Sequence, residues 1–191
     1  MKELVVYIRD ISEHNDQRAF KKLYQHFSPG LISYANTLLR NTQLSEEAVA
    51  DVFVKLWSNR KTLPTISNLS YYLYTATKHT ALNYLHSQKR HNHLDLEAVD
   101  SVFNIQCPET TSIQKENLQQ IEAAINSLPV KCKLVFRLIK ENGLRYKEVA
   151  ELLSISPKTV EAHMTTAYSR IAERLEDMLE EFTSAKKVSA S

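Results

Sequence analysis

The stretch YKEVAELLSISPKTVEAH, which runs from Tyr146 to His163, predicts two helices joined by a turn of three residues. Its apolar residues recur at the spacing that buries side chains between steeply crossing helices, and Ala150 is small where the two backbones must approach. Ser156 is suited to cap the second helix, and Pro157 suits its first turn because proline lacks the N–H that goes unpaired there. Together these features predict a helix-turn-helix.

The second of these helices is expected to turn one face toward DNA. Side chains at the start of such a helix reach base edges in the major groove, so its outward residues are candidate base contacts. They are Lys158, Thr159, Glu161, Ala162, Thr165 and Ser169. We expect His163, on the shoulder of the inner face, to pack there rather than to read a base or bind a metal. An ordinary helical hairpin is the alternative, and nearly balanced local charge predicts only modest DNA affinity.

The composition of the chain fits a helical class. Of its 191 residues 43% are hydrophobic and only two are glycine, so Rossmann turns and phosphate-binding loops are largely excluded. No apolar run approaches the roughly 20 residues of a membrane span, and we expect a cytoplasmic protein. Cys107 and Cys132 lack metal-ligand or disulfide spacing and predict plain thiols. Catalytic residue types do not converge anywhere, so we expect no enzyme, no metal and no cofactor.

Apolar spacing predicts further helices ahead of the helix-turn-helix. Two of them, over residues 19–27 and 31–39, are expected to break at Pro29-Gly30. A third is expected to start at Ser45, where two glutamates follow a capping side chain. A long helix is expected to follow over residues 68–90, opened by an asparagine.

The periodic pattern fails between the two halves of the chain. Residues 95–112 are rich in acidic, hydroxyl and proline residues, which predicts a flexible linker. We therefore expect an all-α protein of two helical domains, the second a four-helix domain that contains the helix-turn-helix. The expected divisions are 1–94 for the first domain, 95–112 for the linker, 113–182 for the second domain and 183–191 for a tail.

The first half contains a long segment without any carboxylate side chain. All lysine and arginine charges of residues 52–94 are therefore unopposed within the segment, which predicts a surface for a polyanion. Tyr71, Tyr74 and Lys78 share one face of the helix expected there, opposite a core face that includes Tyr72. Aromatic rings beside lysine can hold the unstacked bases and phosphates of single-stranded DNA. A solvated surface with snorkelling tyrosines is the alternative.

The helix expected ahead of this segment carries an apolar stripe with charges of both signs along its margins. We expect most of the stripe, Phe53 and Trp57 included, to be core, and the charged margins to dock a partner helix. The docking candidates are Glu46, Glu47, Asp51, Phe53, Lys55 and Trp57.

With a strand-opening surface first and a helix-turn-helix second, the chain resembles a bacterial sigma factor of the extracytoplasmic-function group of the sigma-70 family. The first domain is similar to region two of that group in AFKKLY from Ala19, EEAVADVFVKLW from Glu46 and ALNYL from Ala81. The second is similar to region four in AINSLP from residue 124 and GLRYKEVAE from residue 143, followed by the recognition helix. The runs LWSNR from residue 56 and KTVE from residue 158 are similar to sequences of the Bacteroidetes lineage.

The resemblance implies a division of labour along the chain. The helix from Glu46 to Trp57 would dock the clamp helices of the largest polymerase subunits, and the segment after it would open the minus-ten element. The helix-turn-helix would read the minus-thirty-five element with its outward residues and with Arg145. The minus-ten candidates are Arg60, Lys61, Asn68, Tyr71, Tyr74, Lys78, Lys89 and Arg90. The implied partners are core RNA polymerase, promoter DNA and a membrane-bound anti-sigma factor, with no small-molecule substrate.

Three residues depart from the family's pattern. Ala50 stands where the family often has a glutamine that contacts polymerase. Ser154 replaces a common turn glycine, which is expected to cost about 1 kcal/mol. Arg145 stands where a capping serine or threonine is frequent, so the first helix of the motif is expected to be less well capped.

The function expected from these features is that of a sigma factor, which binds core polymerase and directs promoter-specific initiation of transcription. The main alternative is a regulator of the LuxR type, whose output domain has a similar helix-turn-helix. Such a regulator needs hydrophobic strands and an acidic phospho-acceptor pocket, or a ligand-binding fold, which residues 1–94 do not offer. A helical binding module with no role on DNA is the second alternative.

Overall fold

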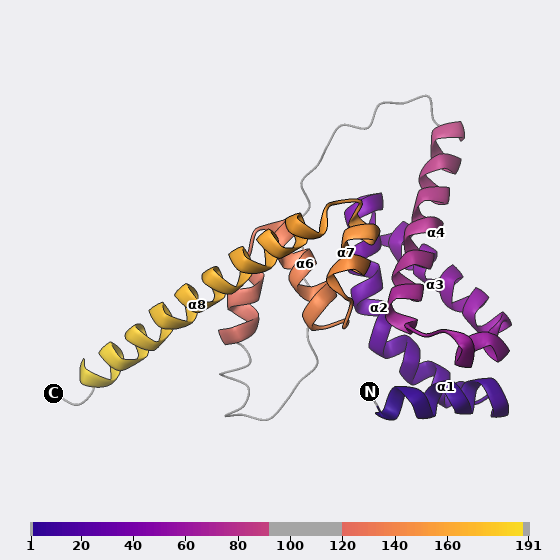
Figure 1. Cartoon of the computed structure of the whole chain (residues 1–191), viewed down its shortest axis with the longest axis horizontal. Helices are drawn as coiled ribbons and strands as arrows, with labels where there is room; N and C mark the ends of the chain where they lie inside the picture. Colours follow the sequence, from indigo (N-terminus) through magenta and orange to yellow (C-terminus); the bar gives the residue numbers. More distant parts are fainter. Residues whose placement is uncertain (1, 92–119, 189–191) are drawn as a thin grey trace. The chain divides into compact units, whose positions relative to one another are not determined.

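The structure is a computed structural model that describes residues 2–91 and 120–188, with side chains described for residues 3–87 and 120–176. The described residues form helices and turns without a β-strand, which confirms the all-α class (Figure 1). They fall into two compact units, divided at residues 105 and 106. The predicted linker lies outside the described residues, so the domain boundaries stay predictions. None of the described helices is long and apolar enough to cross a lipid bilayer.

The first unit, as described over residues 2–91, is a bundle of four α-helices and one short 3₁₀ helix. They are α1 (Lys2–His14), α2 (Gln17–Leu39), α3 (Thr42–Ser58), η1 (Arg60–Thr65) and α4 (Leu69–His91). Helices α2, α3 and α4 pack against one another, and α1 lies against α2 and η1. Their apolar faces meet in one core, in which the largest fully buried side chains include Ile11, Leu23, Leu31, Tyr34, Val49, Leu63, Leu73 and Tyr74. This core decides which faces of α3 and α4 remain available to partners.

Helix α2 runs without interruption through Pro29 and Gly30, so the expected break is wrong. Proline removes one backbone N–H and crowds the preceding turn, which costs about 3 kcal/mol in a helix interior. The helix continues because Phe27, Leu31 and Tyr34 recur on one side of it and are all buried in the core. Tertiary packing therefore outweighs the local signal of the proline.

Helix α3 begins at Thr42, not at Ser45 as expected. Asn41 caps it, because its side-chain oxygen accepts the backbone N–H of Leu44 at 3.0 Å. Ser45 is buried one turn inside the helix, where its hydroxyl donates to the backbone oxygen of Asn41 at 2.7 Å. Asparagine and serine are both good caps, and the sequence alone did not show which of the two ends the loop.

The described part of the second unit, residues 120–188, contains four helical segments, as expected for the second domain. Residues 120–126 are helical, and they are followed by α6 (Val130–Lys140), α7 (Tyr146–Leu153) and α8 (Pro157–Val188). Helices α6 and α7 pack against each other and against α8. Their shared core includes Leu128, Val135, Leu138, Val149, Val160, Met164 and Ala167. Helix α8 extends past the other helices of this unit and continues into the segment predicted as a tail.

A left-handed residue turns the chain from α6 into α7. Gly143 has a φ of 68°, a conformation that glycine adopts without steric cost. The next N–H, that of Leu144, donates to the backbone oxygen of Leu138 at 3.0 Å and closes the end of α6. This closure sets where α7 starts beside α6.

Candidate nucleic-acid and partner interfaces

The turn of the helix-turn-helix has the three residues that the sequence predicted, between the end of α7 and the start of α8. Ser154 is left-handed, with φ 57° and ψ 44°, as expected at a position where the family favours glycine. The Ser156 hydroxyl oxygen accepts the N–H of Thr159 at 3.0 Å, and α8 begins at Pro157. Both predicted start signals are confirmed.

The start of α7 is capped from within the helix. Arg145 was expected to leave this end poorly capped because it lacks a short acceptor side chain. The carboxylate of Glu148 instead reaches back and accepts the backbone N–H of Arg145 at 2.7 Å. A glutamate three residues after the cap supplies one half of a capping box. Arg145 itself makes no side-chain cap hydrogen bond, so the half of the box that a serine or threonine would supply is missing, as expected.

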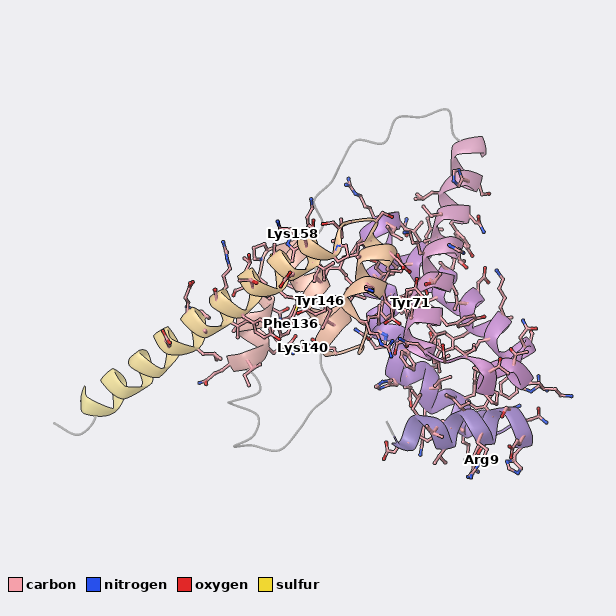
Figure 2. All side chains as sticks on the ribbon, in the orientation of Figure 1. Arg9, Tyr71, Phe136, Lys140, Tyr146 and Lys158 are labelled. Atoms are coloured by element: carbon pink, nitrogen blue, oxygen red, sulfur yellow. The ribbon has the colours of Figure 1, made fainter. Side chains whose placement is uncertain are left out.

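The face of α8 that was expected to read DNA is open to solvent. The exposed candidates are Lys158, Glu161, Ala162, Thr165 and Ser169 on α8, with Arg145 ahead of α7. Lys158 is labelled at the first turn of α8 in Figure 2. Thr159 is half-buried, and its hydroxyl pairs with that of Ser156 at 2.8 Å, so it also supports the turn. The hydroxyl of Thr165 donates to the backbone oxygen of Glu161 at 3.0 Å.

His163 packs on the flank of α8, as expected. Its Nδ1 atom lies 3.4 Å from Sγ of Cys132, a free thiol on α6 that is 5% exposed. This contact ties the recognition helix to α6 on the side away from the reading face. Over residues 2–91 and 120–188, no three His, Cys, Asp or Glu side chains are grouped so as to hold a metal ion.

The tyrosine face predicted on α4 is wrong at Tyr74. That side chain is 1% exposed, and its ring lies edge-on against Tyr34 of α2, with 5.5 Å between the centroids. The neighbouring Tyr72, expected in the core, is 41% exposed. Tyrosine, threonine and alanine positions recur on several sides of α4, so helical periodicity did not show which of two adjacent tyrosines faces α2.

Arg60, a minus-ten candidate, is held by contacts with three groups. Its Nε donates to Oδ1 of Asn15 at 2.5 Å, and its Nη1 donates to the backbone oxygen of Trp57 at 3.0 Å. The guanidinium also lies 4.9 Å from the centroid of the Trp57 ring. These contacts join η1 to the α1–α2 junction and to the end of α3, a structural role that the sequence did not predict. The neighbouring Lys61 is exposed.

The remaining minus-ten candidates lie along α4. The side-chain oxygen of Asn68 accepts the N–H of Tyr71 at 3.2 Å, so Asn68 opens the helix as predicted. Tyr71 and Lys78 are half-buried. Lys89 and Arg90 belong to the last turn of α4, where only the backbone is described.

The charged candidates on α3 are exposed, and one of them also contacts α4. Glu46, Glu47, Asp51 and Lys55 all face solvent. Oδ2 of Asp51 accepts the phenol O–H of Tyr84 at 3.1 Å. Burial, and after it the hydrogen bond to Asp51 and its charge, raises the pKa of Tyr84 above its ordinary value. The surface of α3 is thereby linked to the helix that carries the minus-ten candidates.

Four aromatic rings of α2 and α3 pack together beside these charges. Phe53 is buried, and its ring meets Phe20 and Tyr24 of α2 at centroid distances of 5.9 and 4.8 Å. Trp57 is half-buried and tilted against Phe20 at 4.9 Å. The expectation that Phe53 lies in the core is confirmed.

A groove of about 500 Å³ opens between α2 and α3 along these rings. It is lined by Gln17, Phe20, Tyr24, Ala50, Phe53, Val54, Trp57 and Ser58. Val54 is 64% exposed at the groove, and an apolar hollow of this kind typically receives the side chain of a partner. Tyr24 and Val54 were not among the predicted site residues. The four-residue spacing of Phe20 and Tyr24, and that of Ala50 and Val54, was the signal that could have found them.

Comparison with known proteins assigns a family to each unit. Residues 23–91 match "Sigma-70 region 2", and residues 118–171 match "Sigma-70, region 4". The chain is 23% identical over 176 residues to the ECF RNA polymerase sigma-E factor of Escherichia coli (strain K12), which covers 87% of this chain and 92% of that protein. It is 25% identical over 181 residues to the RNA polymerase sigma-H factor of Pseudomonas aeruginosa, with 88% and 92% covered.

A solved structure is also similar to the chain. It is the sigma factor RpoE in complex with the anti-sigma factor NepR from Bartonella quintana, with a TM-score of 0.47 and 22% identity. The similarity covers 82% of this chain and 96% of that one.

The first helical unit has an apolar groove and a helix without carboxylates, and the second has a helix-turn-helix. These features together define a DNA-binding transcription protein of two parts. The two family matches fall one on each unit. The chain belongs to the sigma-70 family, as an RNA polymerase sigma factor of the extracytoplasmic-function group. The match of the first unit to region 2 leaves the LuxR-type alternative without support.

Proposed function

We propose that this sigma factor docks on core RNA polymerase through the groove-bearing face of α2 and α3, opens promoter DNA with η1 and α4, and reads it with α8. The observation that carries the proposal is the presence, in one chain, of an exposed apolar groove flanked by charges and a helix-turn-helix with an open reading face. Each surface would have a different partner: protein at the groove and DNA at the helix-turn-helix.

For polymerase, the groove supplies the apolar part of the contact. A clamp helix would insert an apolar side chain between Val54 and Trp57, while Glu47 and Lys55 meet its polar margins. Ala50 leaves the groove open where the family often has glutamine. Shape complementarity at the groove would therefore replace the hydrogen bond that a glutamine makes.

For the minus-ten element, we propose a modified set of residues. Tyr74 is omitted because a buried ring cannot stack on a base. Tyr72 takes its place as the exposed aromatic side chain of this acid-free segment. The other candidates are kept: Arg60, Lys61, Asn68, Tyr71, Lys78, Lys89 and Arg90.

For the minus-thirty-five element, we propose the exposed candidates of α8 together with Arg145. Balanced charge around α8 makes each contact weak. Weak contacts suffice when two DNA-binding units sit on one polymerase, because each raises the effective concentration of the other at the promoter. The free protein is therefore expected to bind DNA poorly.

The remaining parts of the proposal rest on the family resemblance. The protein acts in the cytoplasm as an initiation factor, without catalysis, cofactor or small-molecule substrate. A membrane-bound anti-sigma factor holds it inactive until a signal releases it. The runs LWSNR and KTVE support a Bacteroidetes type of the group.

Run-off transcription with purified core polymerase from a compatible host, on genomic fragments, tests the function. We expect start sites that depend on this protein, and weak binding of the same fragments by the protein alone. No dependent start sites with a compatible core would contradict the proposal.

The substitution Val54→Glu tests the groove in a binding assay with core polymerase. It places a carboxylate where docking would strip it of water, so we expect the affinity for core polymerase to fall at least about tenfold, or about 1.4 kcal/mol. Titration of labelled protein with core polymerase measures this affinity. Val5→Glu, which changes a similarly exposed valine of α1, is the control and should leave the affinity unchanged. Equal affinities for all three proteins would place the docking surface elsewhere.

A further inference from the structure

Lys140 and Tyr168 are in contact at one edge of the second unit, and Tyr146 is near enough to act electrostatically on Lys140. Lys140 ends α6, Tyr146 begins α7, and Tyr168 lies further along α8. The Lys140 Nζ atom lies 5.3 Å from the centroid of the Tyr168 ring. Figure 2 labels Lys140 and Tyr146 near each other, beside Phe136. We refer to Lys140, Tyr146 and Tyr168 as the lysine-tyrosine cluster.

Phe136 supports the cluster on the side of the core, and the other side of the cluster is open to solvent. The ring of Phe136, which is largely buried on α6, meets that of Tyr168 edge-on at 6.2 Å. Tyr146 is 39% exposed and Tyr168 47% exposed, and Lys140 is exposed as well. A cation stacked on a fixed ring has fewer conformations to lose when it binds a ligand.

The charges around the cluster favour an anion. The carboxylate that follows Lys140 in the chain, that of Glu141, lies 3.6 Å from Nε of Arg137 and belongs to that ion pair. A hydrogen bond to Tyr168, with the charges of Tyr168 and Tyr146 adding to it, raises the pKa of Lys140. An exposed lysine is a cation at neutral pH, so Lys140 offers a positive charge beside the ring of Tyr168.

The cluster lies on the shoulder of the reading face of α8. Each helical residue advances about 100°, so Tyr168 stands about 60° around the helix from Thr165 and about 100° from Ser169. In three-helix DNA-binding domains, the loop between the first two helices and the later part of the recognition helix contact the DNA backbone. Lys140 and Tyr146 border the corresponding loop here, and Tyr168 lies on the later part of α8.

We propose that the lysine-tyrosine cluster binds a phosphate of the DNA backbone beside the minus-thirty-five element. The ammonium group of Lys140 meets the phosphate charge, and the phenols of Tyr146 and Tyr168 donate hydrogen bonds to its oxygens. Phosphate contacts of this kind set the register of the recognition helix without reading sequence. The inference rests on the proposed function, since it assumes that α8 lies in the major groove.

The test uses holoenzyme assembled from core polymerase and the full chain. Lys140→Gln removes the charge, and Tyr168→Phe removes one O–H but keeps the ring that stacks under the lysine. Lys131→Gln is the matched control, because Lys131 is an exposed lysine near the other end of α6. The affinity for promoter fragments with the native or an altered minus-thirty-five element is measured from about 50 to about 200 mM salt.

Loss of one phosphate contact has a defined signature. For Lys140→Gln we expect the salt slope to shrink by about 1, so that the ratio of wild-type to variant affinity falls about fourfold across this range. The loss should be the same on every minus-thirty-five sequence. For Tyr168→Phe we expect about threefold weaker binding, because one hydrogen bond is lost, with an unchanged slope. Lys131→Gln should behave as wild type.

Two results would overturn the proposal. One is a wild-type salt slope and affinity for Lys140→Gln. The other is weaker binding of Lys140→Gln to core polymerase with unchanged binding of its holoenzyme to DNA, which would assign the cluster to an acidic segment of the polymerase. Failure of the proposed function itself would appear differently, as wild-type holoenzyme that neither binds nor transcribes the fragments.

Discussion

The rings of Tyr34 and Tyr74 meet edge to face in the core of the first unit, where α2 and α4 pack together. Burial raises the pKa of Tyr34 well above its ordinary value, so its phenol stays protonated. An aromatic pair in this geometry contributes about 0.5–1.5 kcal/mol beyond the burial of its area. Tyr72, one position before the core residue Leu73, is left on the outer face.

At the scale of single residues, we predict different effects for Tyr72 and Tyr74, which lie on either side of Leu73 in the sequence. Tyr74→Ala should lower the free energy of unfolding of the first unit by about 3–5 kcal/mol, because it leaves a cavity beside Tyr34. Tyr72→Ala should change that free energy by less than about 0.5 kcal/mol but reduce the yield of open promoter complexes. Denaturant unfolding and permanganate footprinting measure the two effects. A stable Tyr74→Ala protein, or full opening by Tyr72→Ala, would contradict the assignment.

Arg60 shows why residue roles were harder to predict than residue types. Its charge in an acid-free segment predicted a DNA contact, and the structure shows a half-buried guanidinium with partners inside the protein. The fold brings its partners, Asn15 and Trp57, next to it, and Asn15 is 45 residues away in sequence. Asn15 itself is left-handed, with a φ of 55°, and no spacing rule connects it to Arg60. Long-range partners of this kind are fixed by the fold and not by local pattern.

Among the elements, the helix-turn-helix was predicted accurately because every one of its signals is local. The turn length, the cap by Ser156 and the start of α8 depend on neighbours within a few residues. Helix α2 was mispredicted because its continuity through Pro29 depends on side chains that pack against other helices. Local signals therefore located the turn and the start of α8 correctly, but they failed at Pro29, where packing decides, and at the start of α3, where two capping residues compete.

At the scale of the element, we predict that Ser154→Gly stabilises the second unit. Ser154 is left-handed at the end of α7, a conformation that costs an L-residue about 1–2 kcal/mol. Glycine should recover about 1 kcal/mol of unfolding free energy, because its greater freedom in the unfolded chain offsets part of the gain. Ser154→Ala is the control and should bring no gain. Thermal unfolding of the full chain measures both, and equal melting temperatures for Gly and Ala would contradict the strain argument.

The groove between α2 and α3 shows the limit of sequence reasoning about sites. Of the α3 residues that line it, Phe53 and Trp57 were predicted as part of an apolar stripe, whereas the exposed Val54 was not. The other wall comes from Phe20 and Tyr24, and no sequence pattern shows that two helices will leave a hollow between them. Which residues are apolar could be predicted, whereas the shape that they enclose follows from the crossing of the helices.

On the scale of the whole molecule, each of the two units has its own buried core. The fully buried side chains of the first unit come from α1 to α4 with η1, and those of the second from residues 120–188. The two-part organisation was visible in the sequence because the periodic pattern stops over residues 95–112. A core for each unit means that each can be stabilised or destabilised separately.

We therefore predict that damage to one core stays local. Tyr74→Ala in the full chain should speed amide hydrogen exchange in α2, α3 and α4 and leave exchange in α6 and α7 within about twofold of wild type. Ser154→Gly should do the reverse, slowing exchange only in the second unit. Mass spectrometry of peptides from the two units resolves both effects. Matching changes across both units in either variant would show that they unfold as one cooperative body.

The hydroxyl of Thr165 gives its hydrogen to the carbonyl one turn earlier in α8. While that bond is made, the hydroxyl oxygen can act only as a hydrogen-bond acceptor. It would therefore favour a nucleobase that presents an exocyclic amine in the major groove. Adenine and cytosine do so, whereas guanine and thymine turn carbonyl oxygens outward. A hydrogen bond within α8 would thus influence which bases are preferred in the promoters that this protein selects.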